Sequence, residues 1–168
     1  MSDEADFNDP DHCTVGVVGE VGDRLFLFYC RQGLTEITVK VEKQQVAVLA
    51  SYLGRIVKEL GRPGHLPDDL SFDGTEDPEW VVGTIGVSYD EELDRVVVVL
   101  EEVHDEEEEE ESGHVLRIAL TREQAAAFAI HATRLVEAGR PPCPLCGLPL
   151  DPSGHDCPRT NGHRPPVT

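Results

Sequence analysis

The residues most suited to chemistry in this 168-residue sequence lie after residue 140, where three of the five cysteines are found. Cys143 and Cys146 form a C-x2-C pair, a spacing that lets two thiolates reach one tetrahedral metal ion from a tight turn. A structural zinc site needs four ligands, so Cys157 and one histidine, either His155 or His163, would complete a Cys3His set. We therefore expect one structural Zn2+ per chain, bound by a tail of residues 141–168.

Other interpretations of these cysteines are less favoured. A redox C-x2-C pair normally opens a helix after a strand. Here a helix is not expected, because the segment contains Pro141, Pro142, Pro144, Pro149, Pro152 and Pro158. A disulfide is disfavoured in a cytosolic chain. An open catalytic zinc is also less expected, because thiolate-rich sites in short loops are usually closed and structural.

The charge of the chain limits its partners. It has 33 acidic and 14 basic residues, and its formal net charge is -19. Nucleic acids and membrane surfaces are polyanionic and would repel such a surface at long range. No apolar run approaches the roughly 18 residues of a transmembrane helix. We therefore expect a soluble, cytoplasmic protein that does not bind membranes, and nucleic-acid contact only through the tail, which carries little of the acidic charge.

The body before the tail contains one series of elements twice. VGVVG at 15–19 recurs as VGTIG at 82–86, and further strand-like runs follow at 25–30 and 36–41 in one half and at 95–100 and 115–120 in the other. Each half then has an amphipathic helix that opens on EKQQ or TREQ and stops at Gly-Arg-Pro. Thr121 with Gln124 fits a capping box. The sequence therefore predicts an α+β fold made of a duplicated β-β-β-α unit with antiparallel sheets and pseudo-twofold character.

The expected boundaries follow from this repeat. They are a disordered acidic arm at 1–12, a first repeat at 13–63, an acidic linker at 64–79, a second repeat at 80–140 with an acidic loop at 104–113, and the zinc-binding tail at 141–168. The loop contains six consecutive glutamates, 106–111. The segment 88–94 should close the second hairpin. Gly16, Gly19, Gly83 and Gly86 are expected at bulges or close approaches within the sheet, because a strand follows the glycines where a phosphate-binding loop would have a helix.

The tail CPLCGLPLDPSGHDCPRTNGHR, with VEKQQVAVLASYL and LTREQAAAFAIHATRLVEAGRPPCP, resembles an actinobacterial family of uncharacterised proteins, domain-of-unknown-function family 3090. The resemblance covers nearly the whole chain, from Thr14 to Arg164, and implies no assigned activity. Its tail motif maps to Cys143, Cys146, His155 and Cys157. The sequence departs from the family at His163, where a tyrosine is more frequent, so the resemblance favours His155 as the fourth ligand.

Three functions remain open. No catalytic constellation is recognisable in the sequence, which favours a non-catalytic adaptor or regulatory module that binds a protein partner. A second possibility is contact with nucleic acid or the transcription machinery through the tail. A third is an enzyme or accessory protein for a small phosphorylated metabolite, suggested by the phosphoglycerate-mutase-like and lipid-kinase-like neighbours of the family. Such an enzyme would need convergent basic groups, for which the nearest candidates are Arg24, Arg31, Lys40 and Lys43.

Overall fold

The computed structural model of the chain describes residues 4–19, 24–61, 63–103 and 113–138. These residues form seven strands and two helices, in the order β1 (Glu4–Phe7), β2 (His12–Val18), β3 (Leu25–Gln32), β4 (Thr35–Val41), α1 (Lys43–Leu60), β5 (Val82–Asp90), β6 (Arg95–Glu102), β7 (Val115–Leu120) and α2 (Arg122–Ala138). The predicted mixed α+β fold with antiparallel sheets and two helices is confirmed. None of the described helices has the length and apolar character needed to cross a membrane.

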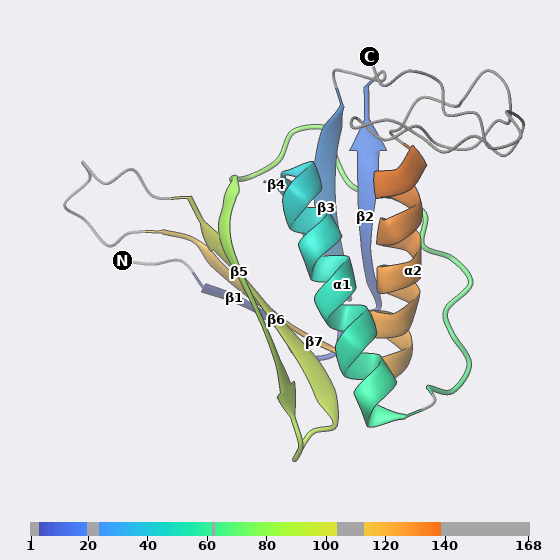
Figure 1. Cartoon of the computed structure of the whole chain (residues 1–168). Helices are drawn as coiled ribbons and strands as arrows, with labels where there is room; N and C mark the ends of the chain where they lie inside the picture. The colour runs from blue at the N-terminus through green and yellow to red at the C-terminus, as the bar shows by residue number, and fades with distance from the viewer. Residues whose placement is uncertain (1–3, 20–23, 62, 104–112, 139–168) are drawn as a thin grey trace, which may run out of the picture.

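The strands form two sheets. One is four-stranded with the order β1-β7-β6-β5, and the other is three-stranded with the order β2-β3-β4. All pairings are antiparallel except that of β1 with β7, which is parallel. In Figure 1, α1 and α2 lie side by side, α2 packs against β2, and the four-stranded sheet lies on the opposite side of α1.

Alternate residues of the strands direct their side chains into the hydrophobic core. In β3, Phe26, Phe28 and Cys30 join the main hydrophobic cluster, which also includes Leu49 and Leu53 of α1. The side chains between them on β3 point to the opposite face of the sheet, because successive strand residues alternate. The ring of Phe28 lies 5.6 Å from that of Phe128 on α2, which ties the helix layer to the sheet.

Strand β1 corrects one expectation. The acidic arm was expected to be disordered, whereas Glu4–Phe7 pairs in parallel with Val115–Ile118 of β7. Glu4 and Asp6 alternate with Ala5 and Phe7, so the acidic side chains occupy one face and the apolar ones the other. Phe7 is only 2% exposed. The many acidic residues of this segment led to the prediction of disorder, although its alternate residues form the apolar face of a strand.

The linker between the halves covers the outer face of the three-stranded sheet. The hydroxyl of Thr14 donates to the Leu70 carbonyl at 2.7 Å, and the ring of Phe72 packs edge-on against Tyr29 at 5.9 Å. Gly16 lies beneath Phe72, and a Cβ at this glycine would come within 2.5 Å of the Phe72 ring. The close approach predicted at Gly16 is therefore confirmed, and its cause is an aromatic side chain from the linker.

Residues 79–81 join the two sheets. The Glu79 N–H donates to the Thr38 carbonyl and the Lys40 N–H donates to the Trp80 carbonyl, both at 2.9 Å. On the other side, the Val103 N–H donates to the Val81 carbonyl at 2.9 Å. The segment thus hydrogen-bonds to β4 and to the chain just after β6.

Strand β5 is longer than predicted. It extends to Asp90, so the turn occupies residues 91–94 where the sequence suggested 88–94. The pairing of β5 with β6 is irregular between Val82 and Thr84, and a Cβ at Gly83 would lie 2.7 Å from the Val103 backbone. Gly83 therefore fits the prediction of a bulge, whereas Gly86 has no atoms within 4 Å of a built Cβ and does not.

Candidate functional site

The predicted zinc ligands Cys143, Cys146, His155 and Cys157, and the alternative His163, lie outside the described residues. Within the described part of the chain, no group of three or more His, Cys, Asp or Glu side chains is placed to hold a metal ion. The donor set of the tail is chemically suited to zinc, because three thiolates and an imidazole match the ligands of closed tetrahedral sites.

The histidines of the body make structural contacts. His12 Nε2 lies 2.7 Å from the Ser71 carbonyl oxygen, and His131 Nε2 lies 2.9 Å from the carbonyl oxygen of Val15. His114 Nδ1 lies 3.0 Å from the Glu102 carboxylate, and its ring stacks on Trp80. The more exposed His65 approaches Asp68 at 3.7 Å. The contacts of His12, His114 and His131 join separate segments of the fold, whereas His65 and Asp68 both lie in the linker.

Cys13 and Cys30 face each other across β2 and β3, and both are buried. Burial raises the pKa of the Cys13 thiol well above its ordinary value, and a hydrogen bond with Cys30 raises it further. Because the thiolate is the nucleophilic form, this pair is suited to core packing and not to covalent catalysis.

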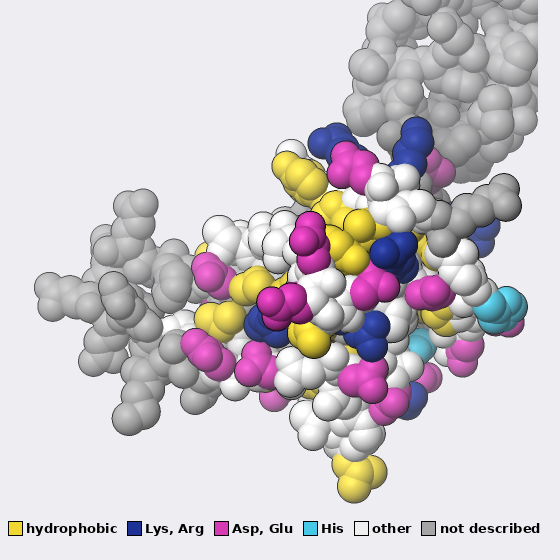
Figure 2. All heavy atoms as spheres, turned by 90° about the horizontal axis from the view of Figure 1, so that it is seen from below, with side chains coloured by type: hydrophobic (Ala, Val, Ile, Leu, Met, Phe, Trp, Pro, Cys, Tyr) yellow, Lys and Arg dark blue, Asp and Glu magenta, His cyan; other side chains and the backbone are white. Residues whose placement is uncertain are grey.

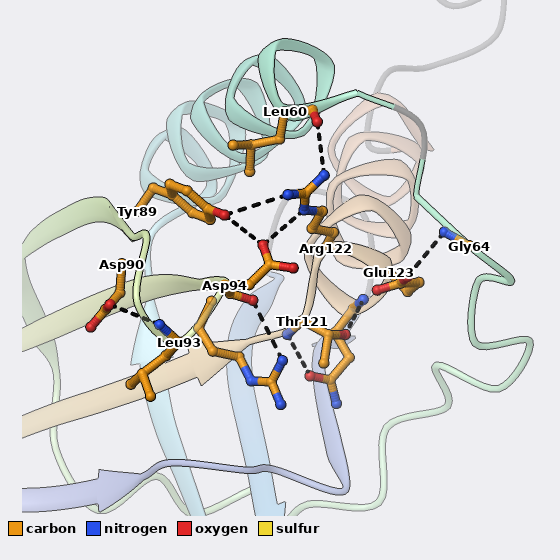
Figure 3. Close-up of polar contacts among 11 residues, drawn as sticks. Leu60, Gly64, Tyr89, Asp90, Leu93, Asp94, Thr121, Arg122 and Glu123 are labelled. Carbon is orange, nitrogen blue, oxygen red and sulfur yellow. Dashed lines mark hydrogen bonds and ion pairs between the residues drawn. The ribbon is translucent and has the colours of Figure 1, made fainter.

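The most connected polar cluster of the body is centred on Arg122, the first residue of α2 (Figure 3). Its guanidinium donates to Asp94 at 2.9 Å, to the Leu60 carbonyl at 2.8 Å and to the Tyr89 hydroxyl at 3.4 Å. Tyr89 in turn donates to Asp94 at 2.5 Å. We call Arg122, Asp94, Tyr89 and Leu60 the Arg122 cluster. It links the start of α2, the end of α1 and the turn between β5 and β6.

The hydrogen bonds of the Arg122 cluster shift the pKa values of its members. The hydrogen bond from Tyr89, and then that from Arg122, lowers the pKa of Asp94, while the bond to Asp94 raises the pKa of Tyr89. The backbone of Asp94 has a φ of 51°, in the left-handed region. Aspartate tolerates that conformation better than most residues. The cluster therefore joins α1, α2 and the β5–β6 turn through its own hydrogen bonds.

A neighbouring contact fixes the start of the linker. The carboxylate of Glu123, also in the first turn of α2, accepts a hydrogen bond from the Gly64 N–H at 3.0 Å (Figure 3). The capping phrase at 121–124 was predicted from the sequence, whereas the long-range contacts of Arg122 and Glu123 have no signal in the sequence and were not predicted.

Two of the basic residues considered for a phosphate site, Arg31 and Lys40, lie apart on the three-stranded sheet. On the three-stranded sheet, Arg31 is paired with Glu36 and Lys40 is paired with Leu27. Their positions are separated by four residues along the strands, about 13 Å at the usual rise of a strand. The Lys40 amine approaches the Glu42 carboxylate at 4.0 Å. The arrangement of these two side chains gives no convergent basic pocket.

The start of α1 lies against β5. The Gln45 side-chain amide donates to the carbonyls of Val82 and Gly83, each at 3.2 Å. Its oxygen accepts a hydrogen bond from the Glu42 N–H at 2.8 Å, which satisfies one of the free amides at the helix start. One side chain therefore both stabilises the beginning of α1 and orients that helix toward the edge of the four-stranded sheet.

Comparison with known proteins places the chain in a family. No curated protein and no solved structure matches it. A family model described as a protein of unknown function, DUF3090, matches residues 5–157. The matched segment includes the positions of Cys143, Cys146, His155 and Cys157 and ends before His163. Because the match covers most of the sequence, the chain belongs to the DUF3090 family.

Proposed function

We propose that this protein is a zinc-binding, non-catalytic adaptor whose folded body presents a metal-bound tail and acidic segments to a protein partner. The observation that carries the proposal is that the histidines and cysteines of the body are engaged in structural contacts. Except for His65, which approaches Asp68 within the linker, the histidines and cysteines of the described residues lie in contacts between elements or in the core. The remaining cysteines and the best-spaced histidine belong to the tail.

The zinc part of the proposal rests on donor chemistry and spacing. Cys143, Cys146, His155 and Cys157 would hold one Zn2+, and the family match extends to the last of them. Bound zinc would act as a structural cross-link in a segment whose prolines and glycines favour no regular element. His163 lies beyond the matched residues, which is a further reason to prefer His155.

The adaptor part rests on charge. The net charge of -19 includes the six consecutive glutamates 106–111. Seen from below, Asp and Glu side chains are distributed over the described surface among fewer Lys and Arg side chains (Figure 2). A basic protein surface would be attracted to such a molecule, and the attraction would weaken as salt increases. Contact of the tail with nucleic acid is the second candidate, since the tail carries little acidic charge.

We also propose that the two halves arose by duplication. The order β-β-β-α occurs twice, as β2, β3, β4, α1 and as β5, β6, β7, α2. The contacts between halves are reciprocal, since α1 packs near β5 and α2 packs against β2. An ancestral unit that paired with a second copy of itself would produce this arrangement after fusion.

Metal analysis of the purified full-length protein tests the zinc part. We expect one zinc per chain, its loss in Cys143→Ser and Cys157→Ser, and retention in His163→Ala. The far-ultraviolet circular dichroism of the body should be unchanged in all three. Absence of stoichiometric zinc in the wild type would contradict the proposal.

Affinity capture from the native cell tests the adaptor part. A captured protein partner should be released by salt and should bind less well after deletion of 106–111. Replacement of the six glutamates by glutamine is the matched control for loop length. Capture that is indifferent to salt and to both changes would contradict an acidic docking loop. Salt-dependent binding of nucleic acid would instead favour the second candidate.

A further inference from the structure

The four-stranded sheet ends at β5, a nine-residue edge strand. Within the described part of the chain, the backbone hydrogen bonds of residues 84–90 join only β6. The outer edge of this segment therefore presents a row of unpaired N–H and C=O groups. Natural edge strands are commonly protected by lysine, proline, a short length or a β-bulge. Strand β5 has its bulge near Gly83, and residues 84–90 contain neither lysine nor proline and only one charge, at Asp90.

One side of α1 runs beside this edge. Gln45 contacts the start of β5, so the side of the helix that bears Gln45 is the side that faces the strand. Residues seven and eleven positions later return to that side of a helix with 3.6 residues per turn. They are Tyr52, which is 50% exposed, and Ile56, which is partly buried. The helical period therefore places an aromatic and an aliphatic side chain on the side of α1 that bears Gln45.

The strand has two different faces. Ile85, Val87 and Tyr89 lie on the inner face and are partly buried against the core. Thr84, Gly86 and Ser88 lie between them and point to the outer face, since strand residues alternate. A strand added at this edge would meet apolar side chains on its inner face and small or polar ones on its outer face.

The spacing between α1 and β5 is fixed at both ends. Gln45 joins the start of the helix to the start of the strand. At the other end, Arg122 binds both the Leu60 carbonyl of α1 and the Tyr89 hydroxyl of β5. Such preorganisation lowers the ordering cost of binding a flexible ligand.

We propose that the β5 edge binds an extended, cationic peptide segment of a protein partner by adding it as a further strand. Backbone hydrogen bonds to residues 84–90 would provide affinity, and apolar peptide side chains at alternate positions would pack beside Tyr52 and Ile56. Basic peptide residues suit the end of the strand where Asp90, Glu91 and Glu92 lie. The proposal rests on the adaptor part of the proposed function and is independent of zinc.

A peptide with alternating valines tests this on the full-length, zinc-loaded protein. The probe is acetyl-Lys-Val-Thr-Val-Ser-Val-Lys-amide. Two matched controls carry backbone N-methyl groups on alternate residues, so that each control blocks the N–H groups along one of the two edges of the extended peptide. We expect the probe to bind and to shift the backbone amide signals of residues 84–90 in nuclear magnetic resonance spectra. At least one N-methylated peptide should bind more than tenfold more weakly. Failure of the probe to bind at 1 mM would overturn the proposal.

Two variants locate the site. Tyr52→Ala should weaken probe binding about tenfold, or about 1.4 kcal/mol, without changing the zinc content. Ile130→Ala removes a side chain of similar exposure, 45%, from α2 and should leave binding unchanged. Equal effects of the two variants would overturn the location. A concentration-dependent dimer that competes with the probe would assign the β5 edge to a second copy of the chain and would also overturn the proposal. Loss of zinc with intact probe binding would count against the zinc part alone.

Discussion

Gln45 and Gln124 occupy equivalent places in their helices and make equivalent contacts to opposite halves of the molecule. The Gln45 oxygen accepts from the Glu42 N–H at 2.8 Å, and the Gln124 oxygen accepts from the Thr121 N–H at 3.0 Å. The Gln45 amide then donates to Val82, at the start of β5, whereas the Gln124 amide donates to the Pro10 carbonyl at 2.7 Å, just before β2. Each helix start is thus attached to the first strand of the other half.

Replacing either glutamine should therefore weaken both a helix cap and a contact between halves. We expect Gln45→Ala and Gln124→Ala each to lower the free energy of unfolding by about 1 to 2 kcal/mol, since partnered backbone groups would lose hydrogen bonds. Urea unfolding followed by circular dichroism measures this. Gln44→Ala, at an exposed neighbouring position, is the control and should change stability by less than about 0.5 kcal/mol. Equal stability of all three variants would refute the shared role.

Two glycines in strands should respond oppositely to the same substitution. Gly16→Ala would place its Cβ within 2.5 Å of Phe72 and should destabilise the protein by about 1 to 3 kcal/mol, the usual cost of overpacking. Gly86→Ala meets no atom within 4 Å and should be neutral or slightly stabilising. Thermal unfolding compares them. The double variant Gly16→Ala/Phe72→Ala should show non-additive losses, and strict additivity would argue against the contact.

Stability should also fall at alkaline pH because of Tyr29. Burial, and then the hydrogen bond to Glu36, raises the pKa of Tyr29 to about 12 from its ordinary value near 10. The protonated phenol is favoured in the folded state, so its contribution is complete below pH 10 and is lost as the pH rises toward 12. Urea unfolding between pH 9 and 12, with tyrosinate absorbance at 295 nm, should show a smaller decline for Tyr29→Phe than for the wild type. Tyr52→Phe is the exposed control, and its decline should match the wild type.

A substitution in β1 tests whether the N-terminal arm contributes to the fold. Phe7 is buried, so Phe7→Ala should cost about 3 to 5 kcal/mol, as expected for an aromatic side chain removed from a core. Leu34→Ala, at a fully exposed turn position, should be nearly neutral. An arm that contributed nothing to the fold would tolerate both changes equally in a denaturant titration.

The regular elements could be predicted because their signals are local. Alternating apolar residues gave the bounds of β7, 115–120, and the capping phrase at Thr121 and Gln124 forms both of its reciprocal hydrogen bonds. Strand β1 was missed because its partner lies more than a hundred residues away. The end of β5 was missed because Ser88 and Asp90 are also typical of turns.

The polar contacts of the body and the predicted metal ligands differ in how far the sequence predicts them, for a physical reason. The Arg122 cluster depends on contacts between Arg122 and residues 28 and 62 positions away, and spacing in one segment carries no such information. The predicted zinc ligands, by contrast, can be recognised from the sequence because they lie close together in one segment. That signal falls on residues outside the described ones, so the ligand set stays a prediction.

The parallel pairing of β1 with β7 has a consequence for synthesis of the protein. Glu4 pairs with Val115, so β1 leaves the ribosome long before its partner strand β7 has been made. Contacts with such long sequence separation slow folding. During translation β1 must therefore remain unpaired until β7 has emerged, and its acidic side chains would favour the solubility of the unpaired segment.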